Sequence, residues 1–360
     1  MQIQLENKGE RLVYLDYMRV LATFCVVLLH VSASNWMVAD VYSSAWGVFN
    51  TYNAATRWGV AVFVMISGAL FLPRQIDTKT LYRKYILKLV GVYFIWAAFY
   101  AFANPAIYKL FGKPIGFSAQ GFITGTITGS YHMWYLPMII GLYMCLPLLR
   151  PLAQKQETLR YFLLLALIFV FAVPQTVGLL TDFGAETWRP YVDAVWTLNS
   201  NMNVQTVLGF AVYFMAGCYL SRTEISPKGR IVIYVLGLAG FAFSAGLNLA
   251  LSRRLGMPNQ NYLGNFTVGP LLEAVAVFVW CKYHLRGEKL HSVVKSLSKY
   301  SLGVYLVHPL VLTGLELMGM HSLRFAPILS IPLLAVLIAA ISFGISWVLH
   351  QIPVIRKIAV

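Results

Sequence analysis

Long runs of hydrophobic residues alternate with short polar segments along the whole chain. A run of about 20 apolar residues can cross the hydrocarbon core of a bilayer as an α-helix. The pattern therefore predicts an all-α polytopic membrane protein with about ten transmembrane helices, in a single domain over residues 1–360. The predicted spans lie at about residues 12–34, 56–73, 86–104, 132–150, 160–180, 204–221, 230–251, 266–284, 300–319 and 326–350.

The composition agrees with this class. Hydrophobic residues make up 59% of the 360 positions and charged residues 11%, whereas a soluble domain has about 25% charged residues. In a soluble protein the net charge of +15 would suggest a nucleic-acid partner. Here the basic residues fall between the hydrophobic runs, mostly in the loops that lie inside if both termini are cytoplasmic, which is the positive-inside pattern. This distribution predicts contact with membrane lipids and not with nucleic acid.

Motifs for metals and bound cofactors do not occur in the sequence. The four cysteines lie within or at the end of apolar runs and lack the spacing of a zinc site. There is no Gly-rich phosphate loop and no Gly-x-Ser-x-Gly nucleophile motif. We therefore expect no metal and no permanently bound cofactor.

The first hydrophobic run carries three ionisable residues, Asp16, Arg19 and His30. Such residues inside a span are costly and are normally functional. Arg19 and His30 are eleven positions apart, which is close to three whole turns, so both lie on one stripe, about 16 Å apart along the axis. The alternative is an ordinary anchor, in which Asp16 and Arg19 snorkel to the interface and His30 bonds to a neighbouring helix.

The segment Leu15-Asp16-Tyr17-Met18-Arg19, followed after ten residues by His30, resembles the first helix of the acyltransferase-3 family of integral membrane O-acyltransferases. Acyl transfer to a hydroxyl needs a base and a positive charge that stabilises an oxyanion. His30 is the candidate base. Arg19 could stabilise the oxyanion or hold the donor, and Asp16 could orient Arg19.

Two further blocks resemble the family near the predicted cytoplasmic side. In the second span, Ser67 is followed by Gly68; this pair could line a donor site, although close helix packing alone explains it. At the start of the third span, Arg83, Lys84 and Lys88 could bind the phosphates of an acyl-CoA. The family usually has Arg-x-x-Arg there, and a plain positive-inside cluster is the alternative.

The fourth and ninth spans carry the remaining blocks. Ser130, His132 and Trp134 resemble one family motif, and Ser130 and Trp134 would share a helical face. Tyr305 and His308, one turn apart, resemble another. The resemblance implies that these residues line the site. An interfacial anchor for the first block and a packing histidine for the second are the alternatives.

A carboxylate, Glu273, lies about two turns inside the eighth predicted span. It needs a cation or hydrogen-bond donors there. Arg19 and His30 are the candidate partners, and the sequence does not choose between them.

The resemblance implies transfer of an acyl group, expected to be acetyl from acetyl-CoA, to a hydroxyl of a cell-surface or lipid-linked glycan. It is to stand-alone members without a fused hydrolase-like domain, including the group with enterobacterial common antigen O-acetyltransferase. It implies a multi-pass protein of the bacterial inner membrane, with polysaccharide-assembly proteins as partners. A transporter with a mid-membrane Arg/His/Glu site is the alternative class. Peptidoglycan, a lipid or a small metabolite are the alternative acceptors.

Overall fold

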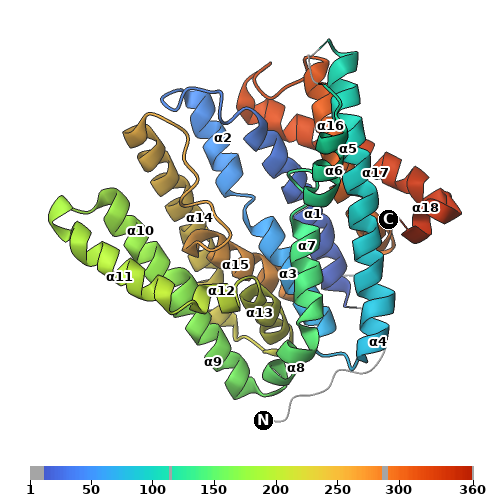
Figure 1. Cartoon of the computed structure of the whole chain (residues 1–360). Helices are drawn as coiled ribbons and strands as arrows, with labels where there is room; N and C mark the ends of the chain where they lie inside the picture. Colours follow the sequence, from blue (N-terminus) through green and yellow to red (C-terminus); the bar gives the residue numbers. More distant parts are fainter. Residues whose placement is uncertain (1–11, 113–115, 286–290, 359–360) are drawn as a thin grey trace. The chain divides into compact units, whose positions relative to one another are not determined.

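The computed structural model describes residues 12–112, 116–285 and 291–358, and within them every regular element is a helix. Contacts divide the chain into two units (Figure 1). Unit 1 draws on Met1–Arg74 and Leu148–Ser298, and unit 2 on Gln75–Pro147 and Lys299–Val360. The predicted all-α class is confirmed.

Unit 1 is built mainly from the helices of the first and middle parts of the chain. They are α1 (Val13–Ser34), α2 (Ser44–Ala54), α3 (Trp58–Phe71), α9 (Gln156–Ala166), the π-helix η2 (Leu167–Ala172), α10 (Val173–Phe183), η3 (Glu186–Trp188), α11 (Arg189–Asn201), α12 (Val204–Leu208), α13 (Ala211–Arg222), α14 (Pro227–Leu255) and α15 (Val268–His284).

Unit 2 contains a second set of helices. They are α4 (Thr78–Thr80), the π-helix η1 (Leu81–Ile86), α5 (Leu87–Leu110), α6 (Ala119–Thr128), α7 (Tyr135–Met144), α17 (Pro327–Gln351) and α18 (Pro353–Ile358). Two more helices, α8 (Leu146–Gln154) and α16 (His291–Leu317), pass from one unit into the other.

Seven helices of the described chain are long and apolar enough to cross a membrane. They are Val13–Ser34, Ser44–Phe71, Thr78–Leu110, Gln156–Phe183, Pro227–Leu255, His291–Leu317 and Pro327–Gln351. The predicted fourth span is a pair, α7 and α8, bent by 65°, at a point where Pro147 and Pro151 remove backbone donors. The spans predicted at 204–221 and 266–284 contain α13 and α15, which are shorter helices.

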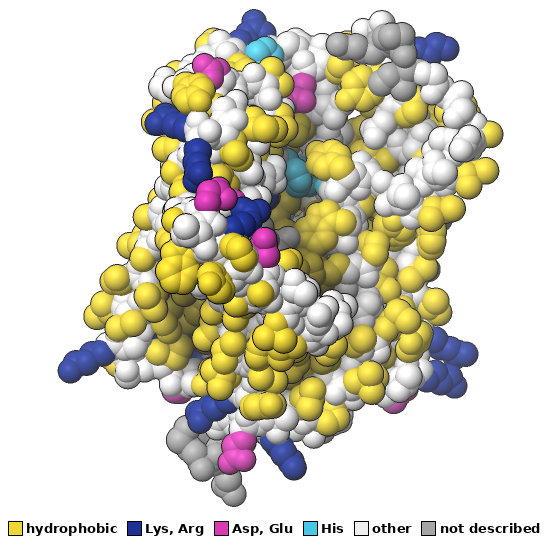
Figure 2. Space-filling view, turned by 60° about the vertical axis from the view of Figure 1, so that its left-hand side comes forward, with side chains coloured by type: hydrophobic (Ala, Val, Ile, Leu, Met, Phe, Trp, Pro, Cys, Tyr) yellow, Lys and Arg dark blue, Asp and Glu magenta, His cyan; other side chains and the backbone are white. Residues whose placement is uncertain are grey.

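Hydrophobic side chains predominate on the face shown in Figure 2, and Lys and Arg side chains on it are sparse. Apolar residues of the long helices are widely exposed, for example Leu238 at 71%, Leu333 at 68% and Ile231 at 61%. A surface of this kind is suited to lipid, because apolar side chains are more favourable in contact with lipid tails than in contact with water. The chain is a multi-pass membrane protein.

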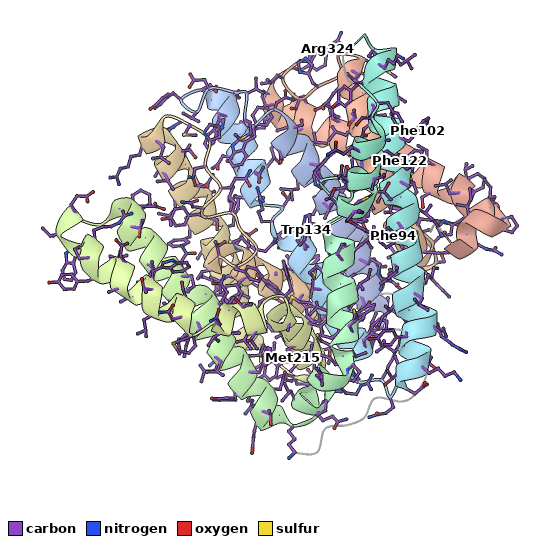
Figure 3. The ribbon with its side chains drawn as sticks, in the orientation of Figure 1. Phe94, Phe102, Phe122, Trp134, Met215 and Arg324 are labelled. Carbon is purple, nitrogen blue, oxygen red and sulfur yellow. The ribbon has the colours of Figure 1, made fainter. Side chains whose placement is uncertain are left out.

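In unit 2, the loop that precedes α7 folds back as a short helix, α6, against α5. Gly125 of α6 faces Ala101 of α5, and the Tyr93 hydroxyl donates to the Ile127 carbonyl at 2.9 Å. Figure 3 labels Phe102 of α5 and Phe122 of α6, which lie near one another. This part of the loop is thus a helix packed against α5.

In unit 1, helices α3 and α13 touch at their backbones. A Cβ atom added at Gly68 would overlap the carbonyl oxygen of Phe214, and one added at Gly217 would overlap that of Met65. Small residues allow this approach, which is how helices commonly associate in membranes. Gly68 therefore has a structural task, since it lets the backbones of α3 and α13 touch.

We predict that Gly68→Ala and Gly217→Ala each lower the thermal stability of the detergent-solubilised protein. Forcing extra atoms into a packed contact costs about 1–3 kcal/mol or more. Gly47→Ala on α2 is the matched control, because no atom lies within 4 Å of its added Cβ. Denaturation followed by fluorescence-detected size exclusion measures the effect. Equal melting temperatures for all three variants would contradict this packing.

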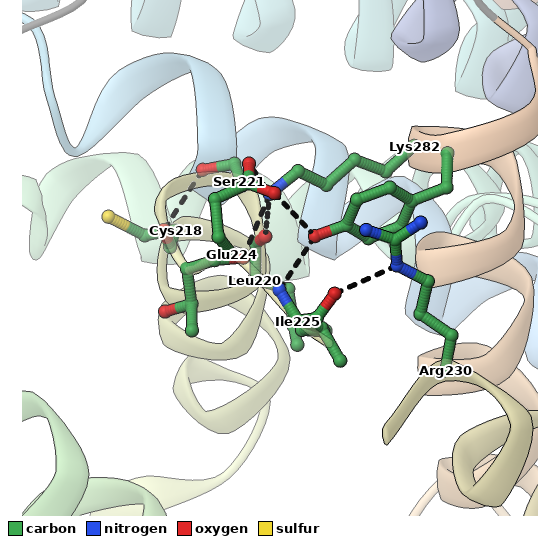
Figure 4. A network of polar contacts seen from close by, with 9 residues as sticks. Cys218, Leu220, Ser221, Glu224, Ile225, Arg230 and Lys282 are labelled. Carbon is green, nitrogen blue, oxygen red and sulfur yellow. Dashed lines mark hydrogen bonds and ion pairs between the residues drawn. The ribbon is translucent and has the colours of Figure 1, made fainter. Parts of the chain in front are cut away.

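A buried lysine joins α15 to the end of α13 (Figure 4). Lys282 Nζ donates to the carbonyls of Leu220 at 3.0 Å and Thr223 at 2.9 Å, and lies 3.5 Å from the carboxylate of Glu224. The last carbonyls of a helix have no partner within it. Lys282 supplies the donors for this helix end and so fixes α15, which also carries Glu273.

Lys282→Met should destabilise the protein by about 1–3 kcal/mol, because it removes charged hydrogen bonds to carbonyls in a buried place. Lys228→Met, at the exposed start of α14, should leave stability unchanged. The same melting assay compares the two. A Lys282→Met protein as stable as wild type would show that the helix end does not need this side chain.

Candidate functional site

The N-terminal end of α1 holds a polar cluster built around Asp16. Arg19 NH1 lies 3.5 Å from Asp16 Oδ1, so the charge pair that the spacing suggested is present. Ser298, at the end of the unit 1 part of α16, bridges the two residues. Its hydroxyl donates to Asp16 Oδ1 at 2.8 Å and accepts from Arg19 NH1 at 2.9 Å. Asp16 is 3% exposed, and these partners balance its buried charge.

A histidine adds to this cluster from the first turn of α16. His291 Nε2 lies 3.6 Å from Asp16 Oδ2. One carboxylate thus contacts Arg19, Ser298 and His291, which fixes its orientation from both oxygens. The guanidinium of Arg19 retains an exposed face, with 29% of its side chain accessible, so it can still contact a ligand.

The other end of the polar stripe carries His30. One ring nitrogen of His30 donates to the carbonyl of Val26, four residues earlier. The guanidinium of Arg57 interacts electrostatically with this ring, and Arg57 Nε donates to Asn53 Oδ1 at 2.7 Å. The imidazole of His30 and the guanidinium of Arg57 therefore interact at this end of α1.

Glu273 lies inside unit 1 on α15 and is 6% exposed. Within the described residues it forms an ion pair with neither Arg19 nor His30, its candidate partners, and its Oε1 accepts no hydrogen bond. Its electrostatic neighbours are the thiol of Cys25 and the hydroxyl of Tyr213. The sequence-based pairing of Glu273 is thus not found, because α15 presents the carboxylate to uncharged groups of α1 and α13.

In unit 2, the candidate phosphate-binding cations lie on the π-helix η1 and the first turn of α5. Arg83, Lys84 and Lys88 are all exposed. Arg83 and Lys84 lie on η1 and Lys88 follows in the first turn of α5, so the three cations belong to one continuous helical segment. Ser67, the other predicted donor contact, is half-buried on α3 in unit 1.

Two histidines, His132 and His308, lie in the core of unit 2. Their ring centroids are 5.8 Å apart. His308 Nδ1 donates to the Val304 carbonyl at 3.1 Å. The Tyr305 hydroxyl donates to the carbonyl of His132 at 2.6 Å. Tyr100 packs against His132 at 5.0 Å. Both histidines are almost fully buried, so the two family blocks meet in one aromatic cluster.

The predicted shared helical face of Ser130 and Trp134 is wrong. Ser130 lies outside any helix, residues 131–134 form a turn, and α7 begins only at Tyr135. In this turn His132 is 2% exposed and Trp134 is 41% exposed, so they point in opposite directions. Ser130 is half-buried. Trp134, labelled in Figure 3, therefore marks the edge of the cluster and not its centre.

The family assignment rests on the whole chain. A model of the acyltransferase-3 family, described as an acyltransferase domain, matches residues 12–350. The chain belongs to this family. Neither the curated proteins nor the solved structures gave a match. The protein is thus a membrane acyltransferase. Its ionisable groups in α1, α15 and α16, together with Arg57 just before α3, are the candidates for the chemistry. Among the described residues, no group of three or more potential metal ligands occurs.

Sequence reasoning about this acyltransferase missed Ser298, His291, Asn53 and Arg57. Ser298 opens a block that resembles the family, but 282 positions separate it from Asp16. Arg57 was placed at the edge of a span, because the second span was predicted to begin at 56. The helical stretch in fact starts at Ser44. The signal was the apolar and aromatic content of residues 44–54, which makes Arg57 an intramembrane charge.

We predict that Ser298→Ala lowers the rate of acyl transfer by about tenfold or more, because hydrogen bonds to charged groups contribute about 1.5–3 kcal/mol. Ser298→Thr, which keeps the hydroxyl, should restore most of the activity. Ser296→Ala, at an exposed position of the same helix, is the control. The measurement is the initial rate of acyl transfer by each variant and by wild type, compared at equal amounts of folded protein. Full activity in Ser298→Ala would show that the bridge has no part in the reaction.

Proposed function

We propose that the protein transfers an acyl group, expected to be acetyl, from acyl-CoA to a hydroxyl of a cell-surface or lipid-linked glycan. The observation that carries this proposal is the His30 imidazole. Inside the membrane helix α1 this ring donates to the Val26 carbonyl and interacts electrostatically with the guanidinium of Arg57. Acyl transfer to a hydroxyl needs both groups.

The proposed reaction has two steps. The basic nitrogen of His30 takes the proton of the acceptor hydroxyl while the hydroxyl oxygen attacks the thioester carbonyl carbon. The carbonyl electron pair moves to its oxygen and forms a tetrahedral oxyanion. As this intermediate collapses, the carbon–sulfur bond breaks and the CoA thiolate takes the proton from His30. The products are the O-acyl ester and CoA.

The exposed cations of unit 2 support a CoA donor. Arg83, Lys84 and Lys88 gather on one helical segment, and such groups suit the phosphates of a nucleotide. In unit 1, exposed aromatic rings support a glycan acceptor. Trp188 and Tyr191 lie 6.2 Å apart at the start of α11, next to the ion pair of Arg189 and Asp193. Rings and charged groups together suit sugar hydroxyls.

His30→Ala should reduce transfer of label from radiolabelled acetyl-CoA into membrane glycan by about 10²–10⁴-fold, the usual contribution of a general base. Membranes from cells that express wild type or variant at equal levels provide the assay. His284→Ala is the matched control, since His284 also donates to a carbonyl four residues earlier but lies at the exposed end of α15.

Three outcomes separate the alternatives. Loss of transfer in His30→Ala, with transfer retained in His284→Ala, supports the proposal. Transfer that persists without His30 leaves the enzyme but moves the base to the His132 and His308 cluster. If wild type binds acetyl-CoA and labels lipid or peptidoglycan instead, the acceptor assignment fails.

A further inference from the structure

Arg57 places a charged side chain within an apolar helical stretch. It lies at the break between α2 and α3, near the middle of the apolar stretch Ser44–Phe71. A charge within a span costs a few kcal/mol and normally faces a polar interior. Its Nε is held by Asn53 at 2.7 Å, and its NH2 group lies 3.5 Å from Gln260 Oε1. Asn53 is fully buried, so its amide is a rigid support.

Helix packing brings Arg57 to His30. Gly59 of α3 faces α1, and its added Cβ would lie 3.4 Å from Val26 Cγ2 and 3.6 Å from Cys25 Cβ. The two helices run in opposite directions. Arg57, two positions before Gly59, and His30, four positions after Val26, are therefore displaced toward the same end, by about 3 Å and 6 Å. The electrostatic interaction between the two side chains agrees with this placement.

The guanidinium of Arg57 has donors to spare. Of its five N–H groups, the contacts above use Nε and one hydrogen of NH2. The NH1 group donates to no acceptor among the described residues. Arg57 is half-buried, so part of its side chain remains accessible. Arg19, by contrast, is engaged with Asp16 and Ser298, about 16 Å along α1 from His30.

We propose that Arg57, held by Asn53, is a catalytic residue that binds the oxyanion formed on the thioester carbonyl when His30 activates the acceptor hydroxyl. This inference rests on the proposed function and assigns the oxyanion to Arg57 instead of Arg19. The guanidinium donates hydrogen bonds to the carbonyl oxygen as it gains charge, and the charge returns to the carbon–oxygen double bond as the thiolate leaves. Arg57 itself exchanges no proton.

The test is chemical rescue of Arg57→Ala. Loss of one oxyanion donor lowers kcat by about 10²–10³-fold, with little change in KM for acetyl-CoA. Added guanidinium chloride at millimolar concentration should restore part of the rate, because it can occupy the space of the missing group. Urea, which has nearly the same shape without the charge, should not. A merely structural role predicts the same response to both compounds.

Further variants keep the result decisive. Arg160→Ala, an exposed arginine on α9, should retain wild-type kcat and show no rescue. If Arg57→Ala does not fold, Asn53→Ala tests the inference in its place. This change removes the group that holds the Arg57 guanidinium, and it should lower kcat about tenfold. Wild-type kcat in folded Arg57→Ala or in Asn53→Ala would overturn the inference while His30→Ala still tests the proposed function. If wild type itself transfers no label, the proposed function fails instead.

Discussion

The cost of a charge inside an apolar helix organises unit 1. An isolated carboxylate in such surroundings is unfavourable by several kcal/mol unless cations and donors surround it. Asp16 meets this demand with Arg19 from its own helix and with Ser298 and His291 from α16. The start of α16 is thereby tied to the start of α1, although the two segments are far apart in the sequence. The direction of the Arg19 side chain follows from the same contacts.

Close backbone packing provides the second constraint. Gly68 and Gly217 let α3 and α13 touch, and Lys282 fixes α15 to the end of α13. The glycine contacts leave little freedom for α3 to slide along α13, because a shift of one residue would bring side chains against backbone. The position of Arg57 beside His30 depends on this register, since Gly59, only two residues away, is the point where α3 meets α1.

Local patterns in the sequence predicted those structural features that depend on residues close together in the chain. The helices, the shared stripe of Asp16, Arg19 and His30, and the Asp16–Arg19 pair all follow from apolar run length and from a spacing of three or four positions. Contacts between distant segments could not be obtained this way. Glu273 was matched to the wrong partners, because its neighbours depend on the rotation of α15. Ser130 was assigned to a helix that begins five residues later.

The two ends of α1 differ in chemistry because a different arginine lies at each, Arg19 at one end and Arg57 at the other. At the N-terminal end, Arg19 is bound to a carboxylate, which neutralises much of its field and leaves a group suited to hold an anion already formed, such as a donor phosphate. At the other end, Arg57 is held by a neutral amide, so its full charge is directed at whatever lies beside His30. A charge that must respond to an oxyanion is most effective when it is rigid and uncompensated in a place of low polarity. Under the proposed mechanism the stripe on α1 would therefore serve as two sites, one that binds the donor and one where the reaction takes place.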